Sequence, residues 1–301
     1  MAISQVRAQI NGTWYTLSYN SSNGRYEATI TAPGATSFHQ SGGYYNVSVE
    51  ATNTAGTKGT ADGSSIAGLR LQVREKVAPV ITILSPTTGA YSTNSKQPVV
   101  FTVTDEAGGS GINADSLVVK LDGTAAAAST LVKTAITNGY SVTYTPASAL
   151  SDGSHTVTVS VSDNDGNAAA AKSTTFKVDT VPPALNVTAP ADGLITPSST
   201  IAVSGKTNDA TSSPVTVKIA LNGADQGSVT VASDGSFNKS VTLAEGTNTI
   251  AITATDAAGK ASSVTRTVTL DTSVPVVVSA TITPNPVDAG ATMIISVEIT
   301  G

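Results

Sequence analysis

Apolar and polar residues alternate along most of the chain with a period of two, the pattern expected of strands that bury one face. The alternation is clearest in three segments: Tyr45 to Ala51, Val157 to Val161 and Ile250 to Ala254. No stretch of about 11 or more residues keeps a helical period, and the alanine run from Ala125 to Ala128 is too short to form a helix. The pattern therefore predicts an all-β protein.

Each of these three segments leads into the same turn motif, Asn/Asp-x-x-Gly. The Asn or Asp side chain can hydrogen-bond to the backbone of the turn, and Gly takes the positive φ that closes it. The motif begins at Asn53, Asp163 and Asp256, so its copies are about 110 and about 93 residues apart. This spacing fits one β-sandwich of about seven short strands per repeat.

A second repeat marks the junctions between the sandwiches. Val178 to Pro183 and Leu270 to Pro275 both carry Asp-Thr shortly before Pro, and Val73 to Pro79 is a looser version. Pro suits the start of an edge strand because it has no N–H to donate. Short junctions that contain Pro are stiff. We therefore predict three sandwiches arranged end to end, at residues 1–77, 78–181 and 182–273.

Residues 274–301 predict only two strands, Val276 to Ile282 and Thr292 to Ile299, joined by a Pro-containing turn. They match the first two strands of a fourth, partial sandwich. Two strands do not bury a core by themselves. Two explanations stay open: the sequence is a piece of a longer protein, or the hairpin adds its strands to another chain.

Composition narrows the function classes. The chain has no Cys, which excludes disulfides, thiolate metal ligands and a cysteine nucleophile. Only 12% of residues are charged, the net charge is -5, and basic residues do not interleave with aromatic ones, so we expect no nucleic-acid binding. We expect no membrane insertion, because no apolar run approaches the roughly 20 residues that a bilayer requires. The N-terminal residues lack the pattern of a secretory signal peptide.

Histidine chemistry gives no catalytic candidate. The two histidines, His39 and His155, fall in different predicted domains. Asp152, Ser154 and His155 supply the residue types of a Ser-His-Asp triad, but a turn that enters a strand explains them equally. We therefore predict that the protein has no catalytic residues and is not an enzyme.

Aromatic residues concentrate at the N-terminal end, where seven of the 13 in the chain fall within the first 45 positions. Exposed Trp and Tyr are good contact residues, so these side chains are candidates for a surface that binds a glycan or a protein partner. The alternative is that they fill the core of the first sandwich. The candidates are Trp14, Tyr15, Tyr19, Tyr26, Tyr44 and Tyr45.

The junctions and turns resemble those of bacterial Ig-like repeats in surface adhesins, in accessory regions of polysaccharide-degrading enzymes and in virion proteins of tailed phages. In the second domain the resemblance lies in Phe101 to Glu106, Ser110 to Ile112 and Leu121 to Gly123. The third domain is similar to the accessory domain of glucodextranase-type proteins in three segments: Val217 to Gly223, Asp234 to Phe237 and Glu245 to Ile250.

The first domain resembles Ig-like modules of tail-associated phage proteins through Asn11 to Tyr15 and Asn23 to Tyr26. The matches to the other repeats cover roughly residues 78–301. The resemblance implies tandem immunoglobulin-like β-sandwiches with a partial fourth domain.

Carboxylates near the junctions raise the question of a cation. Strings of bacterial Ig-like domains sometimes stiffen their junctions with calcium, which requires six or more oxygen ligands. The candidates are Asp105, Glu106, Asp163, Asp165 and Asp179. The alternative is that Asp163 and Asp165 only build a hairpin turn, and that the protein binds no cofactor.

The resemblance implies a non-enzymatic structural or adhesive function. Our first hypothesis is a component of a virion or phage-derived particle, with other particle proteins, surface proteins or a host-surface glycan as partners. In it, residues 274–301 add strands to a neighbour. The alternatives are the stalk of a bacterial cell-surface adhesin and the accessory region of a polysaccharide-active enzyme. Ig-like sandwiches serve many functions, so the fold alone does not decide.

Overall fold

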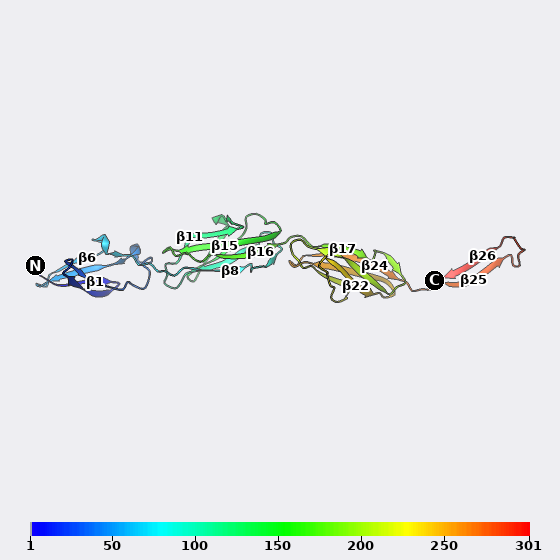
Figure 1. Cartoon of the computed structure of the whole chain (residues 1–301), viewed down its shortest axis with the longest axis horizontal. Coiled ribbons are helices and arrows are strands. Elements are labelled where there is room, and N and C mark those ends of the chain that lie inside the picture. Colours follow the sequence, from blue (N-terminus) through cyan, green and yellow to red (C-terminus); the bar gives the residue numbers. More distant parts are fainter. Residues whose placement is uncertain (1) are drawn as a thin grey trace. The chain divides into compact units, whose positions relative to one another are not determined.

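The computed structural model describes residues 2–301 and confirms that the chain is built of β-strands (Figure 1). Two compact units are distinguished, one ending at Val178 and the other spanning Asp179–Gly301. The described helices are three single turns of 3-10 helix: η1 (Ser41–Gly43), η2 (Ala67–Leu69) and η3 (Ala128–Thr130). No helix among residues 2–301 has the length and apolar character to cross a membrane.

Domain 2, as we name strands β8 to β16, is a two-sheet sandwich. One sheet has the order β13-β14-β10-β8 and the other β12-β11-β15-β16-β9. Within the second sheet, β9 pairs in parallel with β16, while the other pairs are antiparallel. The strands are β8 (Val80–Ser85), β9 (Tyr91–Ser92), β10 (Val99–Thr104), β11 (Ile112–Leu121), β12 (Thr124–Ala125), β13 (Leu131–Ile136), β14 (Gly139–Tyr144), β15 (Gly153–Asp163) and β16 (Lys172–Val178).

Strand alternation builds the core of domain 2 from both sheets. Val99, Phe101 and Val103 of β10 point inward and are fully buried. Val157 and Val159 of β15 belong to the same cluster from the opposite sheet. Burial of apolar area contributes about 25 cal/mol per Å², so these facing side chains, rather than disulfides, hold the two sheets together.

Domain 3, strands β17 to β24, repeats this design. A sheet of order β17-β19-β22 accompanies one of order β18-β24-β23-β20-β21, in which β18 pairs in parallel with β24. Its core includes Val203, Ile219 and Ile252, all fully buried. The strands are β17 (Ala184–Ala189), β18 (Leu194–Thr196), β19 (Thr200–Asn208), β20 (Thr216–Leu221), β21 (Ala224–Asp225), β22 (Ser236–Thr242), β23 (Gly246–Thr255) and β24 (Ala261–Leu270).

Domain 1, strands β1 to β7, has one large sheet of order β3-β2-β1-β5-β6 and a separate short pair, β4 with β7. Among its described residues only Val6, Ala8 and Tyr45 are buried hydrophobic side chains. The strands are β1 (Ile3–Ile10), β2 (Thr13–Asn20), β3 (Arg25–Glu27), β4 (Tyr45–Asn46), β5 (Ser48–Asn53), β6 (Lys58–Ala61) and β7 (Arg70–Leu71).

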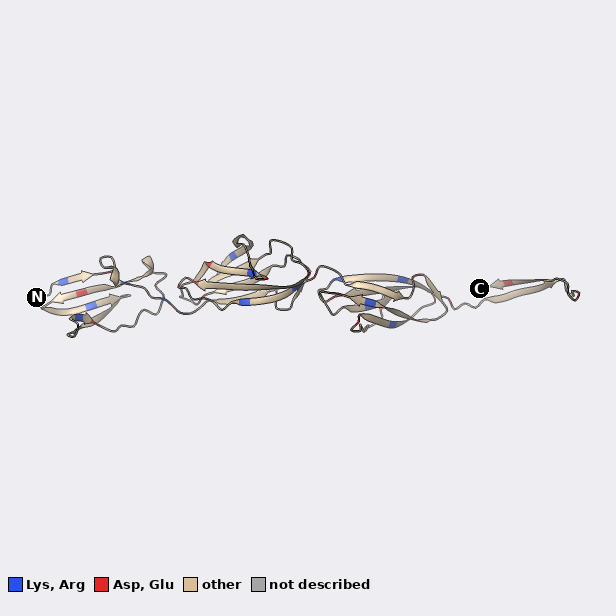
Figure 2. Cartoon of the chain, turned by 45° about the horizontal axis from the view of Figure 1, so that its top comes forward, with Lys and Arg blue, Asp and Glu red and all other residues tan. Residues whose placement is uncertain are grey.

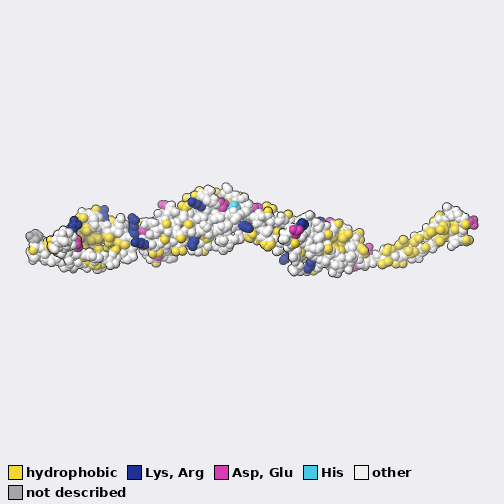
Figure 3. All heavy atoms as spheres, viewed as in Figure 1, with side chains coloured by type: hydrophobic (Ala, Val, Ile, Leu, Met, Phe, Trp, Pro, Cys, Tyr) yellow, Lys and Arg dark blue, Asp and Glu magenta, His cyan; other side chains and the backbone are white. Residues whose placement is uncertain are grey.

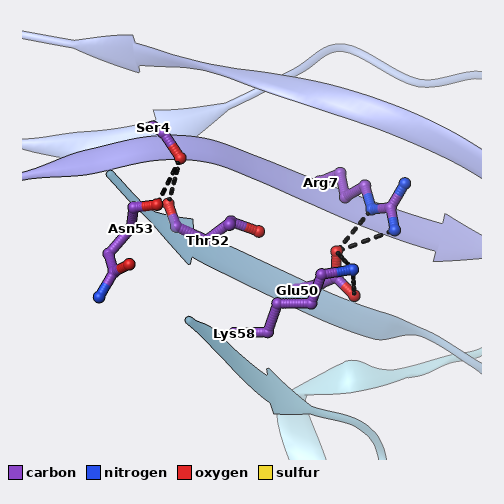
Figure 4. Close-up of polar contacts among 6 residues, drawn as sticks. All are labelled: Ser4, Arg7, Glu50, Thr52, Asn53 and Lys58. Atoms are coloured by element: carbon purple, nitrogen blue, oxygen red, sulfur yellow. Dashed lines mark hydrogen bonds and ion pairs between the residues drawn. The ribbon is translucent and has the colours of Figure 1, made fainter. Parts of the chain in front are cut away.

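One face of the large sheet in domain 1 is polar, and we call it the outer face. On it, Glu50 of β5 lies between Arg7 of β1 and Lys58 of β6, at 2.8 and 3.2 Å (Figure 4). Ser4 donates hydrogen bonds to the backbone carbonyls of Thr52 and Asn53 (Figure 4). Because side chains alternate along a strand, Val6 and Ala8 point to the opposite, inner face.

The repeated Asx turns form as the sequence predicts. The Asn53 side chain accepts hydrogen bonds from the backbone N–H groups of Ala55 and Thr57. Asp163 accepts from Gly166 and Asn167 in the equivalent turn. The motif glycines, Gly56, Gly166 and Gly259, all have positive φ.

The C-terminal hairpin consists of β25 (Val276–Thr283) and β26 (Ile294–Thr300), paired antiparallel. Every residue of both strands is exposed. The predicted pair of strands is therefore present, and it lacks a core of its own.

Both ring nitrogens of His155 have hydrogen-bond partners. Its side chain is buried on β15, with Nδ1 2.8 Å from Asp122 Oδ2 and Nε2 2.8 Å from the Ser151 carbonyl. Burial favours the neutral ring, but the hydrogen bonds with Asp122 and Ser151 and the charge of Asp122 outweigh it and raise the pKa of His155. Burial would raise the pKa of Asp122, but its bonds with His155 and the Thr156 N–H lower it.

This pair predicts a stability maximum at mildly acidic pH. The contribution of His155 is complete below its unfolded pKa of about 6.5 and is lost as pH rises through its raised folded pKa. The contribution of Asp122 is present above about 3.9 and is lost as pH falls through its lowered pKa. We expect domain 2 to be stabilised most by the pair between these limits, as measured by chemical unfolding across pH.

His155→Gln should cost about 1–3 kcal/mol at mildly acidic pH, because a buried charged hydrogen bond is lost. Asp122→Asn removes the carboxylate without changing the shape of the turn. Asn is compatible with this turn, because Asn222 occupies the equivalent turn of domain 3 with φ of 51°, close to 49° at Asp122. The substitution should remove the pH dependence while keeping the turn. An unchanged pH profile in both variants would contradict the assignment.

Candidate functional sites

Charged residues are sparse and scattered over the strands and loops (Figure 2), and two groups of acidic residues are exceptions. The first group, which we call acidic cluster 1, contains Glu75, Asp105 and Glu106, whose nearest oxygens lie within 4.8 Å of one another. Asp105 and Glu106 follow β10, and Glu75 lies in the segment that leads from domain 1 into domain 2. The cluster thus joins a junction residue to the loop at the end of a core strand.

Residues outside acidic cluster 1 donate hydrogen bonds to its carboxylates. Ser110 Oγ donates to Glu75 at 3.1 Å, and the Gly111 N–H donates to Asp105 Oδ2 at 2.7 Å. Asp105 Oδ1 and Glu106 Oε2 are buried and have no hydrogen-bond partner. Burial, with the neighbouring carboxylates of Asp105 and Glu75, raises the pKa of Glu106.

Acidic cluster 2 contains Asp179, Asp209 and Asp256, again with oxygens within 4.8 Å of one another. Asp179 begins the second unit, Asp209 follows β19, and Asp256 follows β23. Asp179 and Asp256 are 1% and 6% exposed, so two carboxylates have been almost wholly removed from water. Such burial is unfavourable without a compensating positive charge or hydrogen bonds.

The hydrogen bonds of acidic cluster 2 leave one buried oxygen without a partner. Ser212 Oγ donates to Asp179, and the Ser212 N–H donates to Asp209 at 2.7 Å. The Lys260 N–H donates to Asp256 Oδ1 at 2.9 Å, while Asp256 Oδ2 is buried and unpartnered. The ion pairs within residues 2–301 involve Glu50, Asp122 and Asp234, and none of them includes a carboxylate of either cluster.

The five carboxylates that the sequence singled out separate into different environments. Asp105 and Glu106 join Glu75, and Asp179 joins the second cluster. Asp163 closes its own turn: burial opposes ionisation, but hydrogen bonds from Asn167 and Gly166 lower its pKa. Asp165 accepts hydrogen bonds from Thr36 at 2.5 Å and from the Glu75 N–H at 3.0 Å, and it therefore ties domain 1 to domain 2.

Sequence reasoning missed Glu75, Asp209 and Asp256. The signal was available in the repeat itself: Asp256 is the counterpart of Asp163 in the Asx turn, and Asp209 follows β19 as Asp105 follows β10. The fold is needed to show which of these acidic residues lie close to the carboxylate of a junction residue, Glu75 or Asp179. Three carboxylates with unpartnered oxygens supply the hard oxygen donors that calcium or magnesium requires.

The aromatic candidates do not form one surface. Trp14 is 41% exposed on the outer face, with the Arg7 guanidinium 4.1 Å from its ring centroid. Alternation along β2 places Tyr15 and Tyr19 on the inner face, and the rings of Tyr19 and Tyr26 lie 5.2 Å apart. Tyr19 is 59% exposed.

Tyr44 and Tyr45 have separate roles. Tyr45 is buried, and its hydroxyl donates to the Ala35 carbonyl at 3.2 Å, so it is a core residue as the alternative hypothesis states. Tyr44 packs beneath the Arg70 guanidinium, 5.2 Å from the ring centroid. The exposed candidates are therefore Trp14 on one face and Tyr19 on the other.

Comparisons with known families follow the domain architecture. Residues 86–180 match the family described as bacterial Ig-like domain, and residues 183–272 match glucodextranase, domain B. No curated protein sequence matches the chain.

Solved structures resemble the chain at low identity. The fibronectin(III)-like modules of Clostridium thermocellum CbhA are 15% identical over 64% of this chain and 94% of that one, with a TM-score of 0.40. A 1.5-MDa bacterial ice-binding adhesin is 22% identical over 90% and 88%, with a TM-score of 0.32. Immunoglobulin domains 1–5 of Sidekick-1 are 13% identical over 99% and 60%, with a TM-score of 0.40.

The first family match spans β9 to β16 of domain 2, and the second spans β17 to β24 of domain 3. The chain is therefore built of tandem Ig-like β-sandwich domains, of which residues 86–180 match the bacterial Ig-like domain family.

Proposed function

We propose that the chain is a non-enzymatic structural and adhesive protein whose Ig-like domains act as spacers. The observation that carries the proposal is that the junction residues are built into the domain that follows them. Glu75 receives hydrogen bonds from Ser110 and, through its carbonyl, from Asn167 of domain 2. Asp179 receives one from Ser212 of domain 3. A linker held in this way transmits position and force better than a free one.

Within this function, we assign the chain to a virion or phage-derived particle. The exposed C-terminal hairpin supports the assignment, because unpaired strand edges and an apolar face suit assembly with neighbouring subunits. The match of residues 183–272 to a glucodextranase domain favours a second candidate, an accessory region of a polysaccharide-active protein. An adhesin stalk remains the alternative that shares the spacer function.

The particle assignment predicts a regular location. In material from the natural source, antibodies against domain 2 should label a tail or tube at a fixed repeat in electron micrographs. Label on the cell wall would support the adhesin stalk instead. Co-purification with a polysaccharide-active catalytic protein, with no particle labelled, would support the accessory region.

We further propose that both acidic clusters take a divalent cation, with calcium as the probe of choice. The buried, unpartnered oxygens of Asp105, Glu106 and Asp256 would become ligands of the cation. Its positive charge would relieve the mutual repulsion of the carboxylates in each cluster. The cation would then connect each junction residue to the domain that follows it in the chain.

Calcium at a hundredfold above its Kd should increase the free energy of unfolding of domains 2 and 3 by about 2–3 kcal/mol. Their melting temperatures should therefore be higher in calcium than in chelator. Asp256→Asn should abolish the gain in domain 3. In chelator the same variant should equal or exceed the wild type in stability, because a buried unpaired charge is removed. Calorimetric unfolding measures both effects.

Asp234→Asn is the matched control for this experiment. Asp234 is an exposed aspartate of domain 3 that pairs with Lys206 at 3.0 Å, outside the cluster. It should leave the response to calcium unchanged. Identical melting temperatures in calcium and in chelator would refute cation binding at both clusters.

Trp14 is the residue we propose for adhesive contact, because it is exposed and its ring is held in place by Arg7. Trp14→Ala should weaken binding to a glycan array or to isolated host surface at least about tenfold, as loss of an aromatic anchor does. Tyr44→Phe, which keeps its ring, should retain binding. A folded Trp14→Ala protein that binds normally would exclude this residue.

A further inference from the structure

Domain 1 can be aligned with domains 2 and 3 through its first turn. β1, β11 and β20 are each followed directly by an Asn or Asp in the left-handed region and then by Gly: Asn11, Asp122 and Asn222. Each of these strands also pairs antiparallel with the strand that leads into the Asx-x-x-Gly turn, namely β5, β15 and β23. β1 is therefore the counterpart of β11 and β20.

In domains 2 and 3 this strand is preceded by an antiparallel pair that we call the opening hairpin. The opening hairpin is β8 with β10 in domain 2, and β17 with β19 in domain 3. It supplies half or more of the strands in the sheet opposite β11 or β20. The described residues of domain 1 contain no counterpart of it, and β4 with β7 is the only strand pair outside the large sheet.

Burial confirms that the inner face of domain 1 is incompletely covered. Val49 and Ala51 of β5 are half-buried, whereas their counterparts Ile252 and Ala254 are fully buried. The outer face cannot be the one awaiting a second sheet, because it carries the Arg7, Glu50 and Lys58 ion pairs (Figure 4).

Domain 1 also lacks the strand pairing that an opening hairpin provides. In domains 2 and 3, β10 pairs with β14 and β19 pairs with β22. β3 belongs to the sheet of β1, whereas β14 lies in the sheet opposite β11. In chain order it is residues 28–33 that take the place of β14 and β22, ahead of the strand that leads into the Asx turn. Residues 28–33 continue from β3 but lie outside any strand, which leaves this edge available for pairing.

The C-terminal hairpin has the properties of an opening hairpin. The segment before it, Leu270-Asp271-Thr272, repeats Val178-Asp179-Thr180 ahead of β17. A Pro follows the first strand of each hairpin directly, at Pro86, Pro190 and Pro284. All three hairpins are antiparallel; their register shift lies near the Pro in β8 and β17 and at the other end of the strand, between Val277 and Ser279, in β25.

The two faces of the C-terminal hairpin differ in polarity. The register pairs Val277 with Ile299, Ala280 with Val297, and Ile282 with Ile295, so that six apolar side chains share one face. The other face carries polar pairs, including Ser279 with Glu298 and Thr281 with Ser296. All of these residues are exposed, and apolar side chains run along the hairpin in Figure 3.

We propose that the C-terminal hairpin of one copy of this chain serves as the opening hairpin of domain 1 in a second copy. Among the described residues, the C-terminal hairpin has no facing sheet, and the large sheet of domain 1 has no opening hairpin. Domains 2 and 3 show how the two parts combine: β26 would pair with the edge at residues 28–33, and the apolar face would cover Val49 and Ala51.

The inference deepens the proposed strand addition by naming its partner, and its test uses the purified chain alone, so it does not depend on the particle. The interface is heterologous, because two different surfaces meet, and it produces rings or open filaments. Light scattering of the full chain should give masses above one chain that rise with concentration. A single-chain mass at every concentration would overturn the proposal.

Two variants separate the donor from the acceptor. Val297→Glu places a charge on the apolar face of the hairpin and should abolish assembly, whereas Ser296→Glu on the polar face of the same strand should assemble normally. Thr29→Pro removes an N–H from the acceptor edge in a segment outside any strand, and should also abolish assembly.

Mixing the two assembly-deficient chains gives the decisive result. Val297→Glu keeps an intact domain 1, and Thr29→Pro keeps an intact hairpin, so an equimolar mixture should form a pair containing one copy of each. Unchanged thermal unfolding of domains 2 and 3 establishes that both variants are folded. A mixture that stays at the mass of one chain, or a Ser296→Glu chain that fails to assemble, would overturn the proposal.

Discussion

The constraint on which this molecule depends is that a β-sheet with one apolar face must be covered by a second sheet. With no cysteine and few charged residues, the chain has little else to stabilise a domain. Domains 2 and 3 satisfy the constraint internally, and their cores contain fully buried side chains from both sheets. Within the described residues, domain 1 satisfies it only in part and the C-terminal hairpin does not satisfy it, since every residue of both its strands is exposed.

The junctions follow a related principle. Acidic side chains lie at the junctions between domains. Backbone N–H groups and serine hydroxyls donate hydrogen bonds to them, and, among the described residues, basic side chains do not. Such an arrangement is poorly balanced electrostatically by itself. We therefore expect the junctions, rather than the apolar cores, to respond to the ionic surroundings.

Much of the fold could be predicted from local sequence. Alternation identified strands such as β15 and β23, and the Asn/Asp-x-x-Gly motif identified turns in which side chain and glycine behave as the chemistry requires. The sites were harder to predict, because Glu75 and Asp105 are 30 residues apart in sequence, and hydrogen bonds from Ser110 and Asn167 to Glu75 hold this junction residue against domain 2. Likewise Trp14 and Tyr15 are neighbours in sequence but lie on opposite faces of the sheet, so an aromatic count could not distinguish one surface from two.

The short strands β9 and β18 have a mechanical consequence. Each pairs in parallel with the last strand of its domain, β16 or β24, and each lies close to the point where the chain enters that domain. Tension applied between the two ends of a domain therefore pulls these paired strands in opposite directions along their length. Their hydrogen bonds share the load together instead of breaking one after another, so this pairing opposes extension of the domain.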